Sequence, residues 1–180
     1  MEKKIPINWE YSDIKVLLQL YRSILKEKPK YLINLESAPK KTKRHVTLKL
    51  IPIGFKPIIE SLDDFKKAIH DILLGLEFLH DRGFVHRDMR WPNVIRDETG
   101  TFRLIDFEHS GRVGSPDFTL VGWPPLEKGV FNQKCDVKMV SHMAREYYNL
   151  WQKEEGACSF VSELEQGLKP LDHSWISSSK

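Results

Sequence analysis

The stretch from Phe84 to Glu108, FVHRDMRWPNVIRDETGTFRLIDFE, constrains the fold of this chain more than any other part of it. It contains the sequence HRD at His86 to Asp88, an asparagine at Asn93, and an apolar run that ends in Asp106. Mg²⁺ prefers hard oxygen ligands and is usually bound by one or two protein groups together with the phosphates of a substrate. Asn93 and Asp106 suit such an ion in type and number, and Asp88 is then left to accept the proton of an attacking alcohol. These residues therefore predict a site that holds a triphosphate and magnesium beside a hydroxyl group.

The same positions closely resemble the catalytic loop and the metal-binding loop of protein kinases, whose signatures are H-R-D-x-x-x-x-N and D-F-G. We call residues 86–93 the catalytic loop and residues 106–108 the metal loop. Glu108 is the departure, because it stands where the kinase signature has glycine. The resemblance implies the α+β class and a protein-kinase-like fold, with a mainly helical C-terminal lobe and a reduced β-structured N-terminal part. It also implies ATP and Mg²⁺ as cofactors and a protein substrate or protein partner.

The resemblance assigns roles to individual residues of both loops. Asp88 corresponds to the catalytic base, and Arg90 corresponds to a cation that stabilises charge on the transferred phosphoryl group. An ordinary surface arginine is the alternative interpretation of Arg90. Asn93 and Asp106 correspond to the magnesium ligands and would contact the cofactor through the metal ion.

Residues 1–54 are expected to be a remnant of the kinase N-terminal lobe. The chain shows helical spacing from Ile14 to Leu25, then a strand pattern at His45 to Ile51 that ends in a proline-glycine linker. In the resembled family the hinge at this place binds adenine through its backbone, which assigns Lys49 and Ile51 to the cofactor. Lys49 also invites a match to the phosphate-binding lysine of kinases. We reject that match, because too few residues separate Lys49 from the next long helix.

No G-x-G-x-x-G occurs in the sequence, and no residue can be matched to the catalytic lysine or to the helix glutamate that pairs with it in kinases. Loss of one preorganised charge-stabilising group typically costs roughly 3 to 4 kcal/mol. The expected function is therefore a weak transfer of the ATP γ-phosphate to a protein hydroxyl. One alternative is a pseudokinase that serves as a binding or scaffold module.

A second alternative is a small-molecule phosphotransferase. The sequence LIDFE at Leu104 to Glu108 also resembles the metal loop of choline and aminoglycoside phosphotransferases. Three features favour the protein-kinase interpretation: Arg87 before the catalytic aspartate, the P-L-E sequence at Pro125 to Glu127, and Asp136 near the start of the next predicted helix.

Residues 55–180 are expected to form the C-terminal lobe and a frayed serine-rich tail. A helix should run along an apolar stripe from a cap at Ser61 to a stop at Gly83. A hairpin should follow the catalytic loop, with its turn at residues 97–100. Asp136 is expected to open the next helix and to anchor the backbone of the catalytic loop.

Charge and cysteine content exclude some classes of protein. The 28 basic and 25 acidic side chains leave a net charge of +3, which is too slight to indicate a nucleic-acid partner. Cys135 and Cys158 form no C-x-x-C pattern, which favours a reducing compartment without a disulfide framework or structural zinc.

No stretch resembles a signal peptide or a membrane span, so we expect a cytoplasmic protein without a membrane partner. One basic run is also compatible with a nuclear localisation signal, although a solvated hairpin tip is the favoured interpretation. The basic residues of this run are Lys40, Lys41, Lys43 and Arg44.

Overall fold

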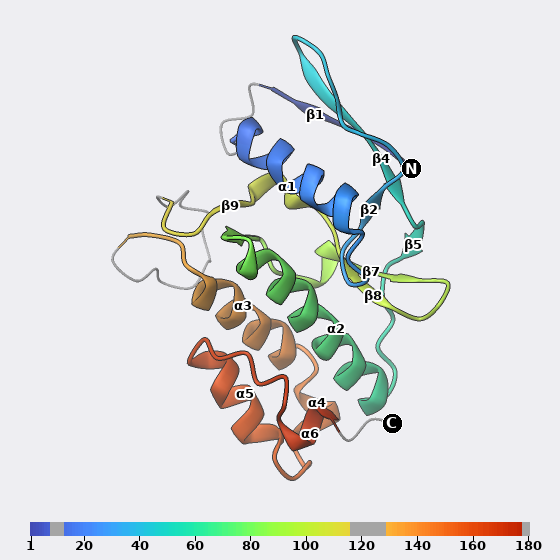
Figure 1. Ribbon diagram of the computed structural model, residues 1–180. Coiled ribbons are helices and arrows are strands. Elements are labelled where there is room, and N and C mark those ends of the chain that lie inside the picture. Colours follow the sequence, from blue (N-terminus) through green and yellow to red (C-terminus); the bar gives the residue numbers. More distant parts are fainter. Residues whose placement is uncertain (8–12, 116–128, 178–180) are drawn as a thin grey trace.

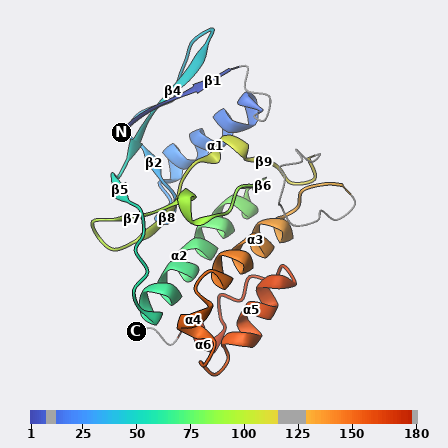
Figure 2. The same cartoon turned by 180° about the vertical axis from the view of Figure 1, so that it is seen from behind.

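The computed structural model of the chain describes residues 1–7, 13–115 and 129–177. A small antiparallel sheet and one helix lie at one end of the molecule, and a larger group of helices lies at the other end (Figure 1). The segment with both predicted loops runs between these two parts (Figure 2). The described strands are β1 (Glu2–Pro6), β2 (Asn34–Leu35), β3 (Lys40–Lys41), β4 (His45–Ile51), β5 (Gly54–Phe55), β6 (Phe84–Val85), β7 (Val94–Asp97), β8 (Phe102–Leu104) and β9 (Gly111–Arg112). The described helices are α1 (Ile14–Glu27), α2 (Leu62–Asp81), α3 (Gln133–Arg145), α4 (Tyr148–Trp151), α5 (Ala157–Glu165) and α6 (Ser174–Ser177), with 3₁₀ turns η1 (Trp91–Asn93) and η2 (Phe107–His109).

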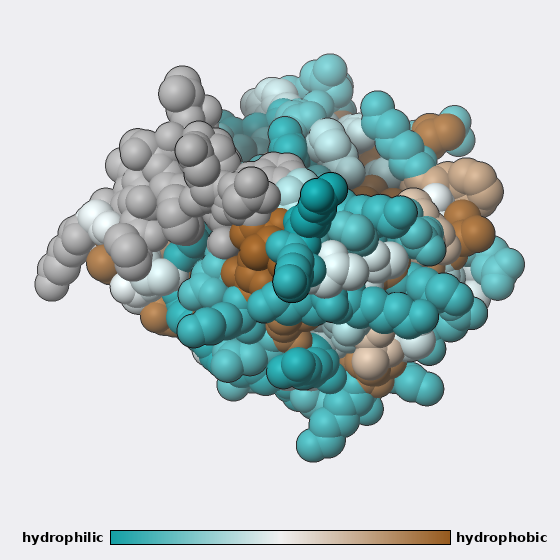
Figure 3. All heavy atoms as spheres, turned by 90° about the horizontal axis from the view of Figure 1, so that it is seen from above, coloured by the Kyte–Doolittle hydropathy of each residue, from teal (hydrophilic) through white to brown (hydrophobic). Residues whose placement is uncertain are grey.

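The sheet is organised around β4, the strand that the alternating pattern predicted. Its order is β1-β4-β2, and β3 also pairs with β4 in an antiparallel manner. The predicted hairpin tip in the basic run is confirmed, because β3 and β4 pair across it. Alternation along β4 buries Leu48 and Leu50 and leaves Lys49 and Ile51 exposed. Seen from the sheet end, the described surface is mostly hydrophilic, with hydrophobic side chains in small groups (Figure 3).

Helix α1 follows the predicted spacing and packs one face into the core. Asp13 caps its start, because its carboxylate accepts a hydrogen bond from the backbone N–H of Lys15 at 2.9 Å. The helix ends at Lys28, whose φ of 49° is left-handed. Its buried face presents Tyr21 to the metal loop, with the Tyr21 and Phe107 rings 5.8 Å apart in an edge-on arrangement.

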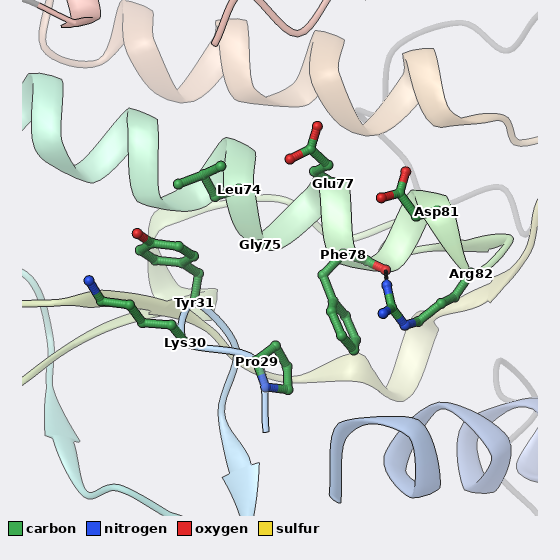
Figure 4. A pocket seen from close by; sticks show the side chains of 9 residues that line it. All are labelled: Pro29, Lys30, Tyr31, Leu74, Gly75, Glu77, Phe78, Asp81 and Arg82. Carbon is green, nitrogen blue, oxygen red and sulfur yellow. Dashed lines mark hydrogen bonds between the residues drawn. The ribbon is translucent and has the colours of Figure 1, made fainter. Parts of the chain in front are cut away.

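Helix α2 is the long support beneath the catalytic loop. Ser61 caps it by accepting a hydrogen bond from Asp64 N at 3.1 Å, and Gly83 follows it with a positive φ of 70°. Gly75 faces the linker between α1 and β2 beside a groove of about 290 Å³ (Figure 4). A Cβ atom at Gly75 would lie only 3.0 Å from the carbonyl oxygen of Tyr31. The glycine therefore lets this linker approach the helix closely.

The β7–β8 hairpin sets the position of the metal loop, and its turn is closed by Asp97. The buried Asp97 carboxylate accepts hydrogen bonds from Thr99 N (2.9 Å), Thr99 Oγ1 (2.6 Å) and Thr101 N (3.0 Å). It also accepts one from Arg103 Nε at 2.6 Å. Burial alone would raise the pKa of Asp97, but the bonds from Thr99, Arg103 and Thr101 outweigh it and lower the pKa from 3.8 to about 2.

This turn predicts a pH-dependent loss of stability. The carboxylate of Asp97 has a lower pKa in the folded chain than in the unfolded chain, so its contribution is complete above about pH 4 and is lost as the pH falls toward about 2. We expect Asp97→Asn to lower the free energy of unfolding by about 2 kcal/mol at pH 7 and by much less near pH 2. Urea denaturation at both pH values checks this, with the exposed turn residue in Glu98→Gln as the control. An equal loss at both pH values would contradict it.

Two parts of the helical region differ from the predictions. Helix α3 begins at Gln133 and not at Asp136, because the side chain of Asn132 caps it by accepting a hydrogen bond from Cys135 N at 3.3 Å. The expected fraying of the tail is wrong for Ser174–Ser177, which form α6 with Trp175 buried against the ring of Phe160. None of the helices in the described ranges is long and apolar enough to cross a membrane.

Candidate active site

The catalytic loop is held by a buried aspartate of α3. Asp136 Oδ2 accepts a hydrogen bond from His86 N, and Asp136 Oδ1 accepts one from Arg87 N, both at 2.8 Å. His80 Nε2 of α2 lies 2.9 Å from Asp136 Oδ2. These bonds hold Arg87 at a positive φ of 70°, which is uncommon for a residue with a side chain. The predicted anchoring role of Asp136 is confirmed.

His86 joins the catalytic loop to the residue before the metal loop. Its Nε2 lies 3.0 Å from the carbonyl oxygen of Ile105, and its Nδ1 accepts a hydrogen bond from Asp88 N at 3.3 Å. Burial lowers the pKa of His86 despite the opposing charge of Asp136, so the ring is neutral at pH 7. A neutral imidazole has one donor and one acceptor nitrogen, which matches these two contacts. His86 therefore acts in this geometry as a link between the loops.

The predicted base, cation and asparagine lie together. Asp88 Oδ2 accepts a hydrogen bond from Asn93 Nδ2 at 2.7 Å and lies 3.0 Å from a guanidinium nitrogen of Arg90. Asn93 Nδ2 also donates to the carbonyl oxygen of Asp88 at 2.7 Å. Asp88 and Asn93 are buried, whereas 59% of the Arg90 side chain is exposed. Both of these bonds use the amide nitrogen of Asn93, and its amide oxygen is a hard ligand of the kind that Mg²⁺ prefers.

The hairpin brings the metal loop beside the catalytic loop. Ile105 N donates a hydrogen bond to the carbonyl oxygen of Asn93 at 3.0 Å. Asp106 directly follows Ile105, so this bond holds the start of the metal loop near Asn93. Asp106 has a left-handed φ of 63°, and 33% of its side chain is exposed. The amide oxygen of Asn93 and the carboxylate of Asp106 are hard oxygen ligands, so the donor set fits Mg²⁺.

Lys3 is the site residue that the sequence analysis missed. No counterpart of the catalytic lysine was found in the sequence, but in the structure Lys3 Nζ lies 3.0 Å from Asp106 Oδ1 and 2.6 Å from Glu108 Oε1. Burial alone would lower the pKa of Lys3, but the hydrogen bonds and negative charges of Glu108 and Asp106 raise it above 10.5. Lys3 is therefore a fixed cation at this site. The only available signal was the alternation of β1, a strand in which Lys3 and Ile5 share the inner face with Leu48 and Val46 of β4.

The structure does not bring the side chain of Lys49 to this site. In β4, Lys49 is exposed on the face opposite Leu48 and pairs with Glu36 at 3.3 Å. Its carbonyl oxygen accepts a hydrogen bond from Glu36 N at 2.8 Å, so that atom is not free to bind adenine. Ile51 ends β4 and is exposed. The P-L-E sequence at Pro125 to Glu127 lies outside the described residues.

Comparisons with known proteins identify the family of this chain. Residues 7–122 match the family model described as "Protein kinase domain". The chain is 38% identical over 90 residues to "Dual specificity protein kinase pyk3" of Dictyostelium discoideum, a match that covers 46% of this chain and 7% of that protein. It is 31% identical over 97 residues to "Serine/threonine-protein kinase TAO3" of Pongo abelii, covering 49% of this chain and 10% of that protein.

A third relative, "cGMP-dependent protein kinase" of Plasmodium berghei, is 40% identical over 53 residues, which are 29% of this chain and 6% of that protein. The chain thus spans only a small part of each of these relatives. The family model, however, covers more than half of the chain and includes both loops of the site. This chain belongs to the protein kinase domain family.

Proposed function

We propose that this chain transfers the γ-phosphoryl group of ATP to a hydroxyl group of a protein. One observation carries the proposal. Asn93 donates to the buried carboxylate of Asp88 at 2.7 Å, a backbone bond of 3.0 Å from Ile105 to Asn93 precedes Asp106 in the chain, and Lys3 lies 3.0 Å from Asp106. This set supplies what phosphoryl transfer needs from a protein, which is mostly positioning and charge stabilisation.

The residues have separate roles in this proposal. Asp88 accepts the proton of the substrate hydroxyl, and Asn93 keeps its carboxylate in place. Arg90 is both close to Asp88 and largely exposed, so its guanidinium can meet the charge on the transferred group. Asn93 and Asp106 would hold Mg²⁺, and ATP would supply the phosphoryl group. Lys3 would bind the phosphates. Weak turnover was expected because a catalytic lysine was missing, and Lys3 would fill that role.

The backbone near the end of β4 completes the nucleotide site in this proposal. With the carbonyl oxygen of Lys49 already bonded and Ile51 in register with Asn34 of β2, we assign adenine binding to the backbone that follows β4. The chain would act in the cytoplasm on protein substrates.

Nucleotide binding is tested by thermal unfolding of the whole chain with and without Mg²⁺ and ATP. At a ligand concentration a hundred times Kd, binding stabilises the folded chain by about 2.7 kcal/mol, which raises Tm by roughly 5 to 10 °C for a protein of this size. Asp106→Asn should abolish the increase, because it removes a charged metal ligand. The exposed acid in Asp63→Asn serves as the control and should keep it. No increase in the unmodified chain, or an unchanged increase in Asp106→Asn, would refute this site.

Phosphoryl transfer then separates the candidate functions. Radiolabel transfer from ATP to a mixture of serine, threonine and tyrosine peptides is the result expected for the proposed function. Binding of ATP without any transfer would indicate a pseudokinase module. Transfer to choline or an aminoglycoside, but not to peptides, would indicate a small-molecule phosphotransferase.

A further inference from the structure

Within the described part of the chain, two carboxylates contact Lys3, and the metal loop supplies both. Its ammonium lies 3.0 Å from Asp106 Oδ1 and 2.6 Å from Glu108 Oε1. The two carboxylates differ in exposure, since 33% of the Asp106 side chain but only 6% of the Glu108 side chain is accessible. A buried carboxylate is costly unless it is paired. Lys3 is the partner that makes the position of Glu108 favourable.

The backbone around Glu108 is held in one conformation. Asp106 is left-handed at a φ of 63°, and residues 107–109 form the 3₁₀ turn η2, which Ser110 N closes by donating to Phe107 O at 3.0 Å. The ring of Phe107 is buried and lies 5.3 Å from that of His86, in addition to its contact with Tyr21 of α1. With Phe107 fixed inside the core, the next side chain is directed to Lys3.

Helix α1 offers no carboxylate for this purpose among its described residues. Glu27 is the only acidic residue within Ile14–Glu27, and it lies in the last turn, where Arg82 Nε donates to its Oε1 at 2.9 Å. Asp13 lies at the other end and caps the helix. Between these ends, the side chain of α1 that meets the metal loop is Tyr21, which cannot replace a carboxylate.

We propose that Glu108 is the positioning residue for Lys3 and has the role that a helix glutamate has in the kinases that this chain resembles. The consequence concerns which part of the chain fixes the position of Lys3. The acid that holds Lys3 belongs to the same chain segment as the metal ligand Asp106, so the position of the lysine does not depend on where α1 lies. This inference rests on the proposed nucleotide site for its effect on binding, but the contact of Lys3 with Glu108 is tested without nucleotide.

The contact is tested by the ammonium signal of Lys3 in chain labelled with ¹⁵N-lysine. The signal is assigned by its loss in Lys3→Arg. Glu108→Gln keeps the size of the side chain and should speed proton exchange of this ammonium with water by roughly tenfold, the effect of losing one strong hydrogen bond to a charged group. Glu27→Gln is the matched control on α1 and should leave the signal unchanged. Unchanged exchange in Glu108→Gln, or faster exchange in Glu27→Gln, would overturn the inference.

The effect on binding is tested by the Kd for ATP with Mg²⁺ in a double-mutant cycle. Glu108→Gln and Lys3→Gln should each weaken binding by roughly tenfold, and the double variant should bind as weakly as Lys3→Gln alone, because Glu108 acts through Lys3. Glu108→Asp should recover part of the loss. Losses that multiply in the double variant would overturn the inference. If the unmodified chain binds no ATP, the proposed function fails, and the exchange measurement decides the positioning role by itself.

Discussion

Replacing Asp136 with alanine is expected to lower the free energy of unfolding by about 3 to 5 kcal/mol, the usual cost of removing one partner from a buried pair. Asp136 is fully buried and accepts the backbone N–H groups of His86 and Arg87. Alanine would leave both donors without an acceptor and would also remove the contact with His80. Because a domain is stable by only about 5 to 15 kcal/mol in total, the variant should be marginally folded. Denaturant unfolding at pH 7 measures the loss.

Two further variants make this expectation specific to the buried carboxylate. Asp136→Asn keeps the size and one acceptor oxygen, so its loss should be clearly smaller than that of alanine. Glu146→Ala removes an exposed acid at the end of the same helix and should change stability by less than about 0.5 kcal/mol. An Asp136→Ala variant within 1 kcal/mol of the unmodified chain would show that the catalytic loop does not depend on this anchor.

The anchor and its loop illustrate what could be predicted from the sequence. The catalytic loop, the hairpin turn and the metal loop lie within one stretch, and their contacts join residues close in the chain, such as Asn93 with Asp88 and Ile105. Helix α2 was predictable because a long apolar stripe with a serine cap and a glycine stop is a strong local signal. Within this stretch, neighbours in sequence are also neighbours in space. The anchor Asp136 lies 50 residues from His86 and was predicted only through the kinase resemblance.

Strand β1 and the role of Lys3 were not predictable in this way. The sequence Glu2–Pro6 contains three charged residues, so its single buried position, Ile5, does not distinguish a strand from a loop. The strand exists because β4 supplies its hydrogen-bonding partners, and the register Lys3 to Leu48 is a tertiary property. Lys3 then meets Asp106 at a separation of 103 residues, which no local motif records. The role of Lys3 could therefore not be predicted from the sequence, because it depends on the long-range pairing of β1 with β4.

The metal loop differs from the kinase signature at Glu108, and this difference changes what contacts Lys3. Glu108 stands where the kinase signature has glycine, and glutamate resists backbone conformations that glycine permits. The structure adds an attractive contact to this restriction. The side chain is buried and paired with Lys3 at 2.6 Å, so the glutamate contributes charge to the site in addition to restricting its backbone.

Replacing Asp88 with asparagine is expected to reduce the rate of phosphoryl transfer by about 10² to 10⁴, the usual contribution of a general base. The amide has the size of the carboxylate but cannot accept the proton of the substrate hydroxyl. It can still accept hydrogen bonds from Asn93 and Arg90 through its oxygen, so the loop should keep its shape. The Kd for ATP with Mg²⁺ should therefore change little. Initial rates of radiolabel transfer and a binding titration measure the two quantities.

This separation of rate from binding distinguishes Asp88 from Asp106. The Asp106→Asn variant should lose nucleotide binding and turnover together, because it removes a proposed metal ligand, whereas Asp88→Asn should lose turnover alone. Asp81→Asn, at the exposed end of α2, is the matched control and should change neither quantity. If Asp88→Asn transfers phosphate as fast as the unmodified chain, the proton is removed by another group or by water. The carboxylate would then only hold Asn93 and Arg90 in place, and the buried Asp88 would be a structural residue of the loop.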